Sequence, residues 1–343
     1  MTHRRKQAFF WAAIYFRILY VHFENIIVHI PFPSVAVNGW QLASRAFAGG
    51  RKSYRTKQQW KSFFGALINP QFASRWFKIL KSPDLLLIAT HRPWLYLKPF
   101  RVYMSIRWTK KQKIKVILDT YQFILSKGEA FMQVITRSSG VEITRFKLND
   151  TIKGVLTLGY DYRYRKEGEL VLFFECNQLG GRIVAAAFSF EELEPGQWAC
   201  RIGCVQGHAL DPDNENLSKT VQKLIYGLRP KSFIVFVVQE FSRQLGLTAV
   251  YGVGDSIQAY RRKHLIHLPK RHAIHFDYNA IWSECGGQPD SDGWYELPLT
   301  PVRKNIQEVK TNKRALYRRR YLLLDELSLK IADTVKNLSS DGL

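Results

Sequence analysis

The sequence has few cysteines and no long apolar run, and both scarcities limit the classes of protein that it can encode. Four cysteines in 343 residues do not make the disulfide framework of a secreted scaffold and fit a reducing compartment. Nowhere does an apolar run reach the roughly 20 residues that a membrane-spanning helix needs. The apolar start, Ala8–Phe16, ends at Arg17 and lacks a small-residue cleavage site. It predicts an uncleaved amphipathic helix and a cytoplasmic protein.

The sequence also lacks the short motifs of common catalytic and metal sites. No GxSxG, HExxH, P-loop or GxGxxG motif occurs in its required context. Cys200 and Cys204 would share one face of a strand, but no histidine-rich motif accompanies them, so we expect buried apolar cysteines. Four histidines between His264 and His275 lie among five lysines and arginines, which disfavours the neutral imidazoles that a metal needs. We therefore predict no metal site.

Acidic residues are nearly missing from the first third of the chain. Residues 1–115 contain 21 Lys and Arg but only Glu24 and Asp84 as acids, whereas residues 116–302 contain 20 basic and 21 acidic residues. Residues 303–320 are again basic, with eight Lys and Arg and one acid. Six of the nine Trp also lie in the first third. Such a charge asymmetry predicts contact with anionic lipid or nucleic acid.

Hydrophobic periodicity predicts an α+β fold. Pro70 and Pro83 each open a helical segment, and a helix over about 109–127 begins with a Thr109–Gln112 capping box and ends at Gly128. After Gly128 the period becomes two, which predicts an antiparallel meander followed by late helices and one more strand. The expected strands are 130–136, 141–147, 155–160, 170–176, 182–190, 198–205 and 248–253, and the late helices are 216–226 and 232–245.

This pattern divides the chain into three parts. Residues 1–128 are predicted to form a basic, Trp-rich helical module, and residues 129–302 an α+β core. Residues 303–343 form a basic helical tail, in which five apolar residues could dock on the body or on a partner: Leu322, Leu323, Leu327, Leu329 and Ile331.

Several separated motifs, in a fixed order, carry a resemblance to a known family. IGCVQG at Ile202–Gly207 precedes GLRPK at Gly227–Lys231, and FDYNAIWSECGG at Phe276–Gly287 precedes ELPL at Glu296–Leu299. These segments resemble the VirK family of Gram-negative bacteria, which is grouped with a domain of unknown function. One departure is Asp255, where the family pattern has Asn. The resemblance implies a role in virulence, antimicrobial-peptide resistance and envelope upkeep, and no established reaction.

A second resemblance concerns the core around residues 198–253. Strand, polar loop, helix and strand resemble the core of N-acyltransferases, and this implies acyl-CoA as a cofactor, with its pyrophosphate at a helix start. Three carboxylates, Asp211, Asp213 and Glu215, would repel that pyrophosphate, and the spaced Gln/Arg and Gly pattern is missing. An active acyltransferase and a fold relative without this activity both remain open.

The candidate site residues come from the family-like motifs, and we expect several to converge where strand ends meet helix starts. They are Gln206, Gly207, Lys219, Arg229, Asp255, Tyr260, Tyr278 and Glu284. Membrane or anion contact is expected at the start of the chain, through Arg4, Arg5, Lys6, Trp11 and Arg17.

Three functions fit these features. The first is a peripheral protein at the cytoplasmic face of the inner membrane that senses or modifies envelope lipid, because basic and aromatic residues alternate through the first hundred residues. The second is a non-catalytic adaptor. The third is a nucleic-acid-binding protein, against which stands the lack of a nucleic-acid motif.

Overall fold

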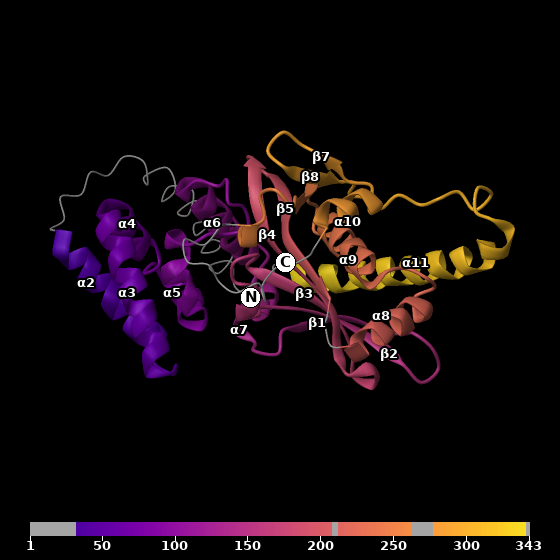
Figure 1. Ribbon diagram of the computed structural model, residues 1–343, viewed down its shortest axis with the longest axis horizontal. Helices are drawn as coiled ribbons and strands as arrows, with labels where there is room; N and C mark the ends of the chain where they lie inside the picture. Colours follow the sequence, from indigo (N-terminus) through magenta and orange to yellow (C-terminus); the bar gives the residue numbers. More distant parts are fainter. Residues whose placement is uncertain (1–31, 208–211, 262–276, 341–343) are drawn as a thin grey trace.

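The computed structural model describes residues 32–207, 212–261 and 277–340, and it combines a helical region with one large sheet (Figure 1). In Figure 1 the indigo and purple helices lie at one end, the sheet lies in the middle, and a long yellow helix extends toward the other end. This arrangement confirms the predicted α+β fold. Among the described residues, no helix combines the length and the apolarity that crossing a membrane requires.

Local signals explain where the helices of the first region begin. Pro occupies the first turn of α4 and of α5, where its missing N–H costs no hydrogen bond. The capping box of α6 is present, since the Thr109 side chain accepts from the Gln112 N–H and Gln112 accepts from the Thr109 N–H. The elements are α2 Phe32–Ala46, α3 Lys52–Ile68, α4 Pro70–Ile79, α5 Pro83–His91, η1 Pro93–Phe100, α6 Lys110–Ser126 and α7 Glu129–Thr136.

The eight-stranded sheet has the order β1-β2-β3-β4-β5-β6-β8-β7. Neighbours pair antiparallel, except that β5 and β6 are parallel. Short turns therefore connect β1 to β5, whereas the parallel step from β5 to β6 needs a helical crossover. The strands are β1 Val141–Lys147, β2 Lys153–Gly159, β3 Leu170–Cys176, β4 Gly181–Glu194, β5 Gln197–Gly207, β6 Ala249–Val253, β7 Gln288–Pro289 and β8 Trp294–Leu297.

The late helices enclose the core. Helix α9 is buried on nearly all sides and packs on β3, β4 and β5, which explains the apolar run Phe233–Val238 in its middle. Helix α11 packs on β1 and α9. Ile202 and Val205 of β5 are fully buried in this core, and Phe236 of α9 is also buried. These helices are α8 Pro212–Leu224, α9 Pro230–Gln244, α10 Tyr278–Glu284 and α11 Thr311–Ser340, with short η2 Tyr162–Tyr164, η3 Asn177–Leu179 and η4 Ala259–Arg261.

One prediction about secondary structure is wrong, and one about packing holds only in part. Residues 130–136 form helix α7 and not a strand, because Phe131, Val134 and Ile135 have the i, i+3, i+4 spacing that one helical face buries. In the tail, Leu322 and Leu329 are 68% and 70% exposed, so they do not dock on the body, and docking on a partner stays a prediction. They lie on the outer face of α11, whereas the remaining three apolar residues of the tail are buried as predicted: Leu323, Leu327 and Ile331.

A β-bulge separates the surroundings of the two closely spaced cysteines. Ala187 pairs with Cys204 and Phe188 with Ile202, so β5 carries one extra residue, Gly203. Because of this extra residue, Cys200 and Cys204 do not share one face of β5 as the regular alternation of a strand predicted. The Cys200 thiol accordingly contacts Ser242 of α9, whereas the Cys204 thiol contacts Glu167. Both thiols are buried, and no group of three or more potential ligands for a metal occurs in the described part of the chain.

Candidate ligand site between the helices and the sheet

A buried ionic network joins the helical region to the sheet. Lys98 of η1 forms an ion pair with Glu169, which directly precedes β3, and the Tyr121 hydroxyl of α6 donates to the same carboxylate. Glu169 is fully buried, and burial lowers the pKa of Lys98 to about 8 although Glu169 opposes that shift. Arg92, 1% exposed, donates to the Glu169 carbonyl over 2.7 Å. This network fixes η1 against the sheet.

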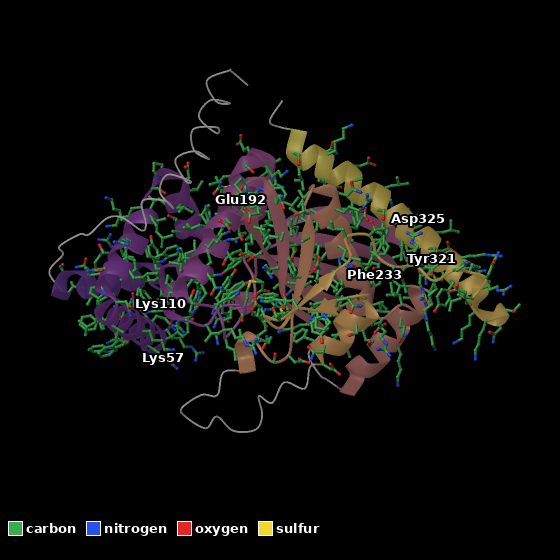
Figure 2. All side chains as sticks on the ribbon, turned by 90° about the horizontal axis from the view of Figure 1, so that it is seen from above. Lys57, Lys110, Glu192, Phe233, Tyr321 and Asp325 are labelled. Carbon is green, nitrogen blue, oxygen red and sulfur yellow. The ribbon has the colours of Figure 1, made fainter. Side chains whose placement is uncertain are left out.

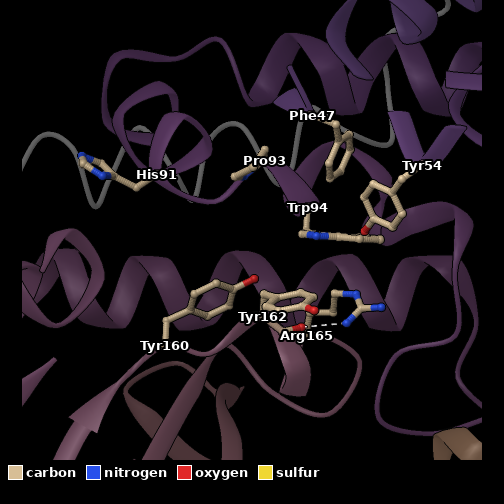
Figure 3. Close-up of a pocket in the computed structure, with 8 residues that line it drawn as sticks. All are labelled: Phe47, Tyr54, His91, Pro93, Trp94, Tyr160, Tyr162 and Arg165. Carbon is tan, nitrogen blue, oxygen red and sulfur yellow. Dashed lines mark hydrogen bonds between the residues drawn. The ribbon is translucent and has the colours of Figure 1, made fainter. Parts of the chain in front are cut away.

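A pocket opens beside this network, and we call it the junction pocket (Figure 3). Its volume is about 470 Å³, which is within the range typical of small-molecule sites. Figure 3 shows Phe47, Tyr54 and Trp94 on the helical side, facing Tyr160, Tyr162 and Arg165 on the sheet side. The lining residues are Phe47, Tyr54, His91, Pro93, Trp94, Tyr160, Tyr162 and Arg165.

A narrow inner cavity lies next to the junction pocket and is lined mostly by cations. Its volume of about 10 Å³ is close to the space that one water needs. Trp94 and Arg165 line both spaces, so the two are adjacent. The lining residues of the inner cavity are Trp94, Lys98, Arg101, Val102, Tyr103, Arg165 and Lys166, and no carboxylate is among them.

Mutual repulsion is evident among the cations at this junction. Burial, together with Arg165, lowers the pKa of Arg101 to about 10. Burial also lowers the pKa of Lys61 to about 8, and four cations contribute: Arg101, Lys57, Lys166 and Arg165. Among the described residues, none of these five side chains forms a salt bridge. A site with excess positive charge and no carboxylate partners suits an anion.

A fork between β5 and β6 forms a second polar site. The parallel pairing ends at Ile202 and Gly252, while β5 continues to Gly207. The carboxyl group of Glu167 lies at this fork, where its Oε1 accepts from Gln206 over 3.4 Å and from Gln258 over 3.3 Å. Burial raises the pKa of Glu167 to about 8, against the opposing effects of Cys204, Lys166 and Arg165. Glu167 is therefore largely protonated at neutral pH.

Three predicted site residues lie around the fork, and a fourth positions one of them. Gln206 contacts Glu167, and both Tyr260 and Tyr278 interact electrostatically with Glu167. The Asp255 carboxylate accepts from the backbone N–H of Tyr278 over 3.2 Å and also from that of Asn279. Asp255 thus caps α10, a task for which its carboxylate serves as well as the Asn of the family pattern.

The remaining predicted residues lie elsewhere. Arg229 and Glu284 form an exposed ion pair of 3.0 Å with each other. Lys219 is exposed on α8, and Gly207 ends β5 without the positive φ or close contact that would require glycine. The predicted contacts at the start of the chain lie outside the described residues: Arg4, Arg5, Lys6, Trp11 and Arg17.

Sequence reasoning missed the residues that build the junction. Lys98, Arg165, Glu167 and Glu169 belong to no short motif, and a charged run such as residues 163–169 resembles a solvated turn. A weak signal was available in the segment from Trp94 to Tyr103, which alternates aromatic and basic residues without an acid. Only contacts far apart in sequence reveal that Glu167 and Glu169 are buried.

Helix α3 carries an exposed apolar stripe, which we call the α3 ridge: Trp60, Phe64 and Ile68, exposed by 47%, 50% and 75%. Their spacing of four residues places them on one helical face. Lys57 and Lys61 each precede a ridge aromatic by three residues and share that face. The opposite face of α3 is buried but mostly polar, with Gln58, Gln59, Ser62 and Ala66. Figure 2 shows Lys57 at the helical end of the molecule, far from Tyr321 and Asp325 of α11.

Comparison with known proteins places this fold and its site in a family. The profile of a family described as "Protein of unknown function (DUF535)" matches residues 51–333. The chain belongs to the DUF535 family. This is the family of VirK and YbjX, so the resemblance seen in the sequence motifs is confirmed. The DUF535 match covers the α3 ridge, the fork between β5 and β6, and the junction pocket apart from Phe47.

Individual DUF535 relatives come from two bacteria. The uncharacterized protein YbjX of Escherichia coli (strain K12) is 27% identical over 285 residues, which are 82% of this chain and 83% of YbjX. An uncharacterized protein of Haemophilus influenzae is 33% identical over 135 residues, which are 39% of this chain and 43% of that protein. The comparison with solved structures gave no match.

Proposed function

We propose that this DUF535 protein acts peripherally at the cytoplasmic face of the bacterial inner membrane, where its helical region binds anionic lipid in the upkeep of the envelope. The observation that carries this proposal is the inverted polarity of α3, which exposes Trp60, Phe64 and Ile68 and buries glutamines. A helix that only packed on the body would do the reverse. The VirK resemblance extends the proposal to virulence and antimicrobial-peptide resistance.

The distribution of charge supports a membrane over a protein partner. Residues 32–115 contain 17 Lys and Arg, which are the 21 of residues 1–115 without Arg4, Arg5, Lys6 and Arg17. Asp84 is the single acidic residue in the same range. Each lysine or arginine near an anionic leaflet contributes about 1 kcal/mol. On the order of five such contacts with partial insertion of the ridge suffice for micromolar binding, about −8 kcal/mol. Tryptophan prefers the membrane interface, where Trp60 would lie.

Vesicle co-sedimentation of the full chain tests this proposal. We expect binding to phosphatidylglycerol vesicles that weakens in 1 M salt, because the screening length falls to about 3 Å. The variant Trp60→Ser/Phe64→Ser/Ile68→Ser should bind at least about tenfold more weakly, because three inserted side chains lose their burial in the apolar phase.

The matched control is Leu322→Ser/Leu329→Ser, which removes exposed leucines from α11 and should bind vesicles as the wild type does. The membrane proposal is wrong if the full chain ignores anionic vesicles at low salt. Tight binding to DNA or RNA under the same conditions would replace it with the nucleic-acid function, and binding to neither would favour the adaptor.

Acyl transfer at the fork is a second candidate function, and we propose it on a specific arrangement. Parallel strands β5 and β6 diverge beyond Ile202 and Gly252, next to the bulge at Gly203, and ligands of α/β sheets bind at the carboxyl ends of such strands. Bound acyl-CoA would supply the acyl thioester. The ionised form of Glu167, whose share grows as the pH approaches its raised pKa near 8, would accept the proton of an acceptor amine. The amine nitrogen would bond to the thioester carbonyl carbon, the C–S bond would break, and CoA would leave as its thiolate. The three carboxylates of residues 211–215 would repel the pyrophosphate of acyl-CoA. The proposal therefore concerns the acyl thioester end of that molecule.

Calorimetric titration of the full chain with acetyl-CoA and octanoyl-CoA tests the second candidate. We expect binding and, when a primary amine is added as acceptor, a release of CoA thiol that falls by about a hundredfold or more in Glu167→Gln, a typical loss for a general base. Glu142→Gln, on the exposed edge strand β1, serves as the control. No binding of either thioester at millimolar concentration would exclude acyl transfer.

A further inference from the structure

We propose that the junction pocket binds a compact phosphate ester, with its phosphate against Arg165, near the charges of Arg101 and Lys166 in the inner cavity, and its organic part between Trp94, Tyr54 and Tyr162. This site is separate from the α3 ridge and from the fork, and it requires neither the membrane function nor acyl transfer. The same chemistry occurs in a free phosphate ester and in a phospholipid headgroup, and the experiment below distinguishes these two sources.

The charges around the pocket select a phosphate. The inner cavity is lined by Lys98, Arg101, Arg165 and Lys166, and of these only Lys98 has a carboxylate partner, Glu169. The adjacent acid Glu167 is buried and contributes little negative charge at neutral pH. A phosphate carries up to two negative charges on several oxygens, and guanidinium groups bind it through paired N–H donors.

Both guanidinium groups are already oriented by aromatic rings. The Arg165 Cζ lies 4.3 Å from the centre of the Trp94 ring, and the Arg101 Cζ lies 5.0 Å from it. Gln58 accepts from Arg101 over 2.6 Å, and the Tyr162 carbonyl accepts from Arg165 over 2.8 Å (Figure 3). These contacts orient the two cations without neutralising them, so little conformational entropy is lost when an anion binds.

The aromatic walls specify the organic part of the ligand. Trp94 packs edge-on against Phe47 and Tyr54, with ring centres 5.1 and 6.4 Å apart. Tyr160, which faces them in Figure 3, is supported from behind by the buried Arg92 guanidinium, 4.1 Å from its ring centre. Rings on both sides suit a small organic group whose C–H groups pack against them, and a volume of about 470 Å³ limits its size.

Calorimetry and thermal unfolding of the full chain test the site, with sn-glycerol 3-phosphate and inorganic phosphate as probes. We expect the ester to bind, and Arg165→Gln to weaken its binding by about tenfold or more, the loss typical of one charged hydrogen bond. Tyr162, 56% exposed, allows a wall variant, Tyr162→Ala, that folds normally and also weakens binding. The control Arg137→Gln removes an exposed arginine outside the pocket and should bind as the wild type does.

Thermal unfolding separates binding from a structural role. Without ligand, Arg165→Gln should unfold at the same temperature as the wild type or higher, because it relieves repulsion from Arg101 and Lys61. A lower unfolding temperature with unchanged affinity would make Arg165 structural and overturn the proposal. Equal affinity of Arg165→Gln and Arg137→Gln for every probe would overturn it as well.

Phosphatidylglycerol vesicles distinguish the source of the phosphate. If the wild type binds the soluble ester and Arg165→Gln loses that binding, the ligand is a free phosphate ester. If the wild type ignores both soluble probes but binds vesicles, and Arg165→Gln loses that binding while Arg137→Gln keeps it, the ligand is a lipid headgroup. The ridge variant Trp60→Ser/Phe64→Ser/Ile68→Ser should lose vesicles and keep the soluble ester, so failure of the membrane function leaves the pocket result intact.

Discussion

Replacing Glu167 with Gln is expected to stabilise the protein at alkaline pH and to leave its stability at about pH 4 unchanged. Burial raises the pKa of Glu167 from 4.5 to about 8 in the folded chain. The folded state thus binds a proton that the unfolded state has released. Between these two pH values the wild type loses stability as pH rises, by about 1.4 kcal/mol per pH unit. Its stabilising contribution is complete below the unfolded pKa and is lost above about pH 8.

The size of the effect follows from the same shift. A rise of the Glu167 pKa from 4.5 to about 8 corresponds to a change in the free energy of unfolding of at most on the order of 5 kcal/mol. Relaxation of the protein around the charged carboxylate reduces this change. Glutamine has the shape of protonated glutamate and never ionises, so the variant avoids the loss. Urea unfolding at a series of pH values measures the difference between the two proteins.

A surface glutamate provides the control for this measurement. Arg145 holds the pKa of Glu142 below its usual value, so Glu142→Gln should be slightly destabilising above the pKa of that carboxyl. Glu142→Gln should not raise the free energy of unfolding at alkaline pH. Parallel stability curves for wild type and Glu167→Gln from pH 5 to 9 would mean that Glu167 is not buried at the fork.

Lys98→Met is expected to destabilise the protein by about 3–5 kcal/mol, because it leaves the fully buried Glu169 without its cation. The hydroxyls of Tyr121 and Tyr103 still interact with that carboxylate, but neutral donors do not compensate a buried charge. Chemical denaturation at neutral pH measures the loss. The expected consequence is loosening of η1 from the sheet, and with it of the junction pocket.

A double variant distinguishes the lost charge pair from lost packing. Lys98→Met/Glu169→Gln removes both charges and keeps an acceptor for Tyr121, so it should regain much of the stability. The exposed pair of Lys330 and Glu326 supplies the comparison, since Lys330→Met should cost no more than about 1 kcal/mol. A double variant no more stable than Lys98→Met would show that the methylene stem of Lys98, and not its charge, matters.

Elements with local causes were predictable from the sequence. The Thr109–Gln112 capping box and the prolines of α4 and α5 act within one helical turn, and alternation along β2 reflects the burial of one face of that strand. Helix α7 was misread as a strand because its eight residues are rich in apolar side chains, and both periods fit so short a segment.

The two sites differ in how far they were predictable. Gln206, Tyr260 and Tyr278 were identified through family motifs and lie around the fork, whereas Glu167, to which they are oriented, was not. Its burial depends on Gly203, whose missing side chain lets the Glu167 carbonyl approach β5: a Cβ there would lie 2.0 Å from that oxygen. No local pattern encodes this contact between positions far apart in the chain.

The sequence by itself determined the α+β class, the capped helices, the meander, the family and the excess of positive charge in the first third. Each depends on composition or on neighbours within a few residues. Tertiary structure alone decided which charges are paired and which face of α3 is exposed. Lys98 and Glu169 pair across 71 residues, and Arg165 joins Trp94 across the same junction. Burial and Coulomb energies depend on distance in space, which the order of residues does not specify.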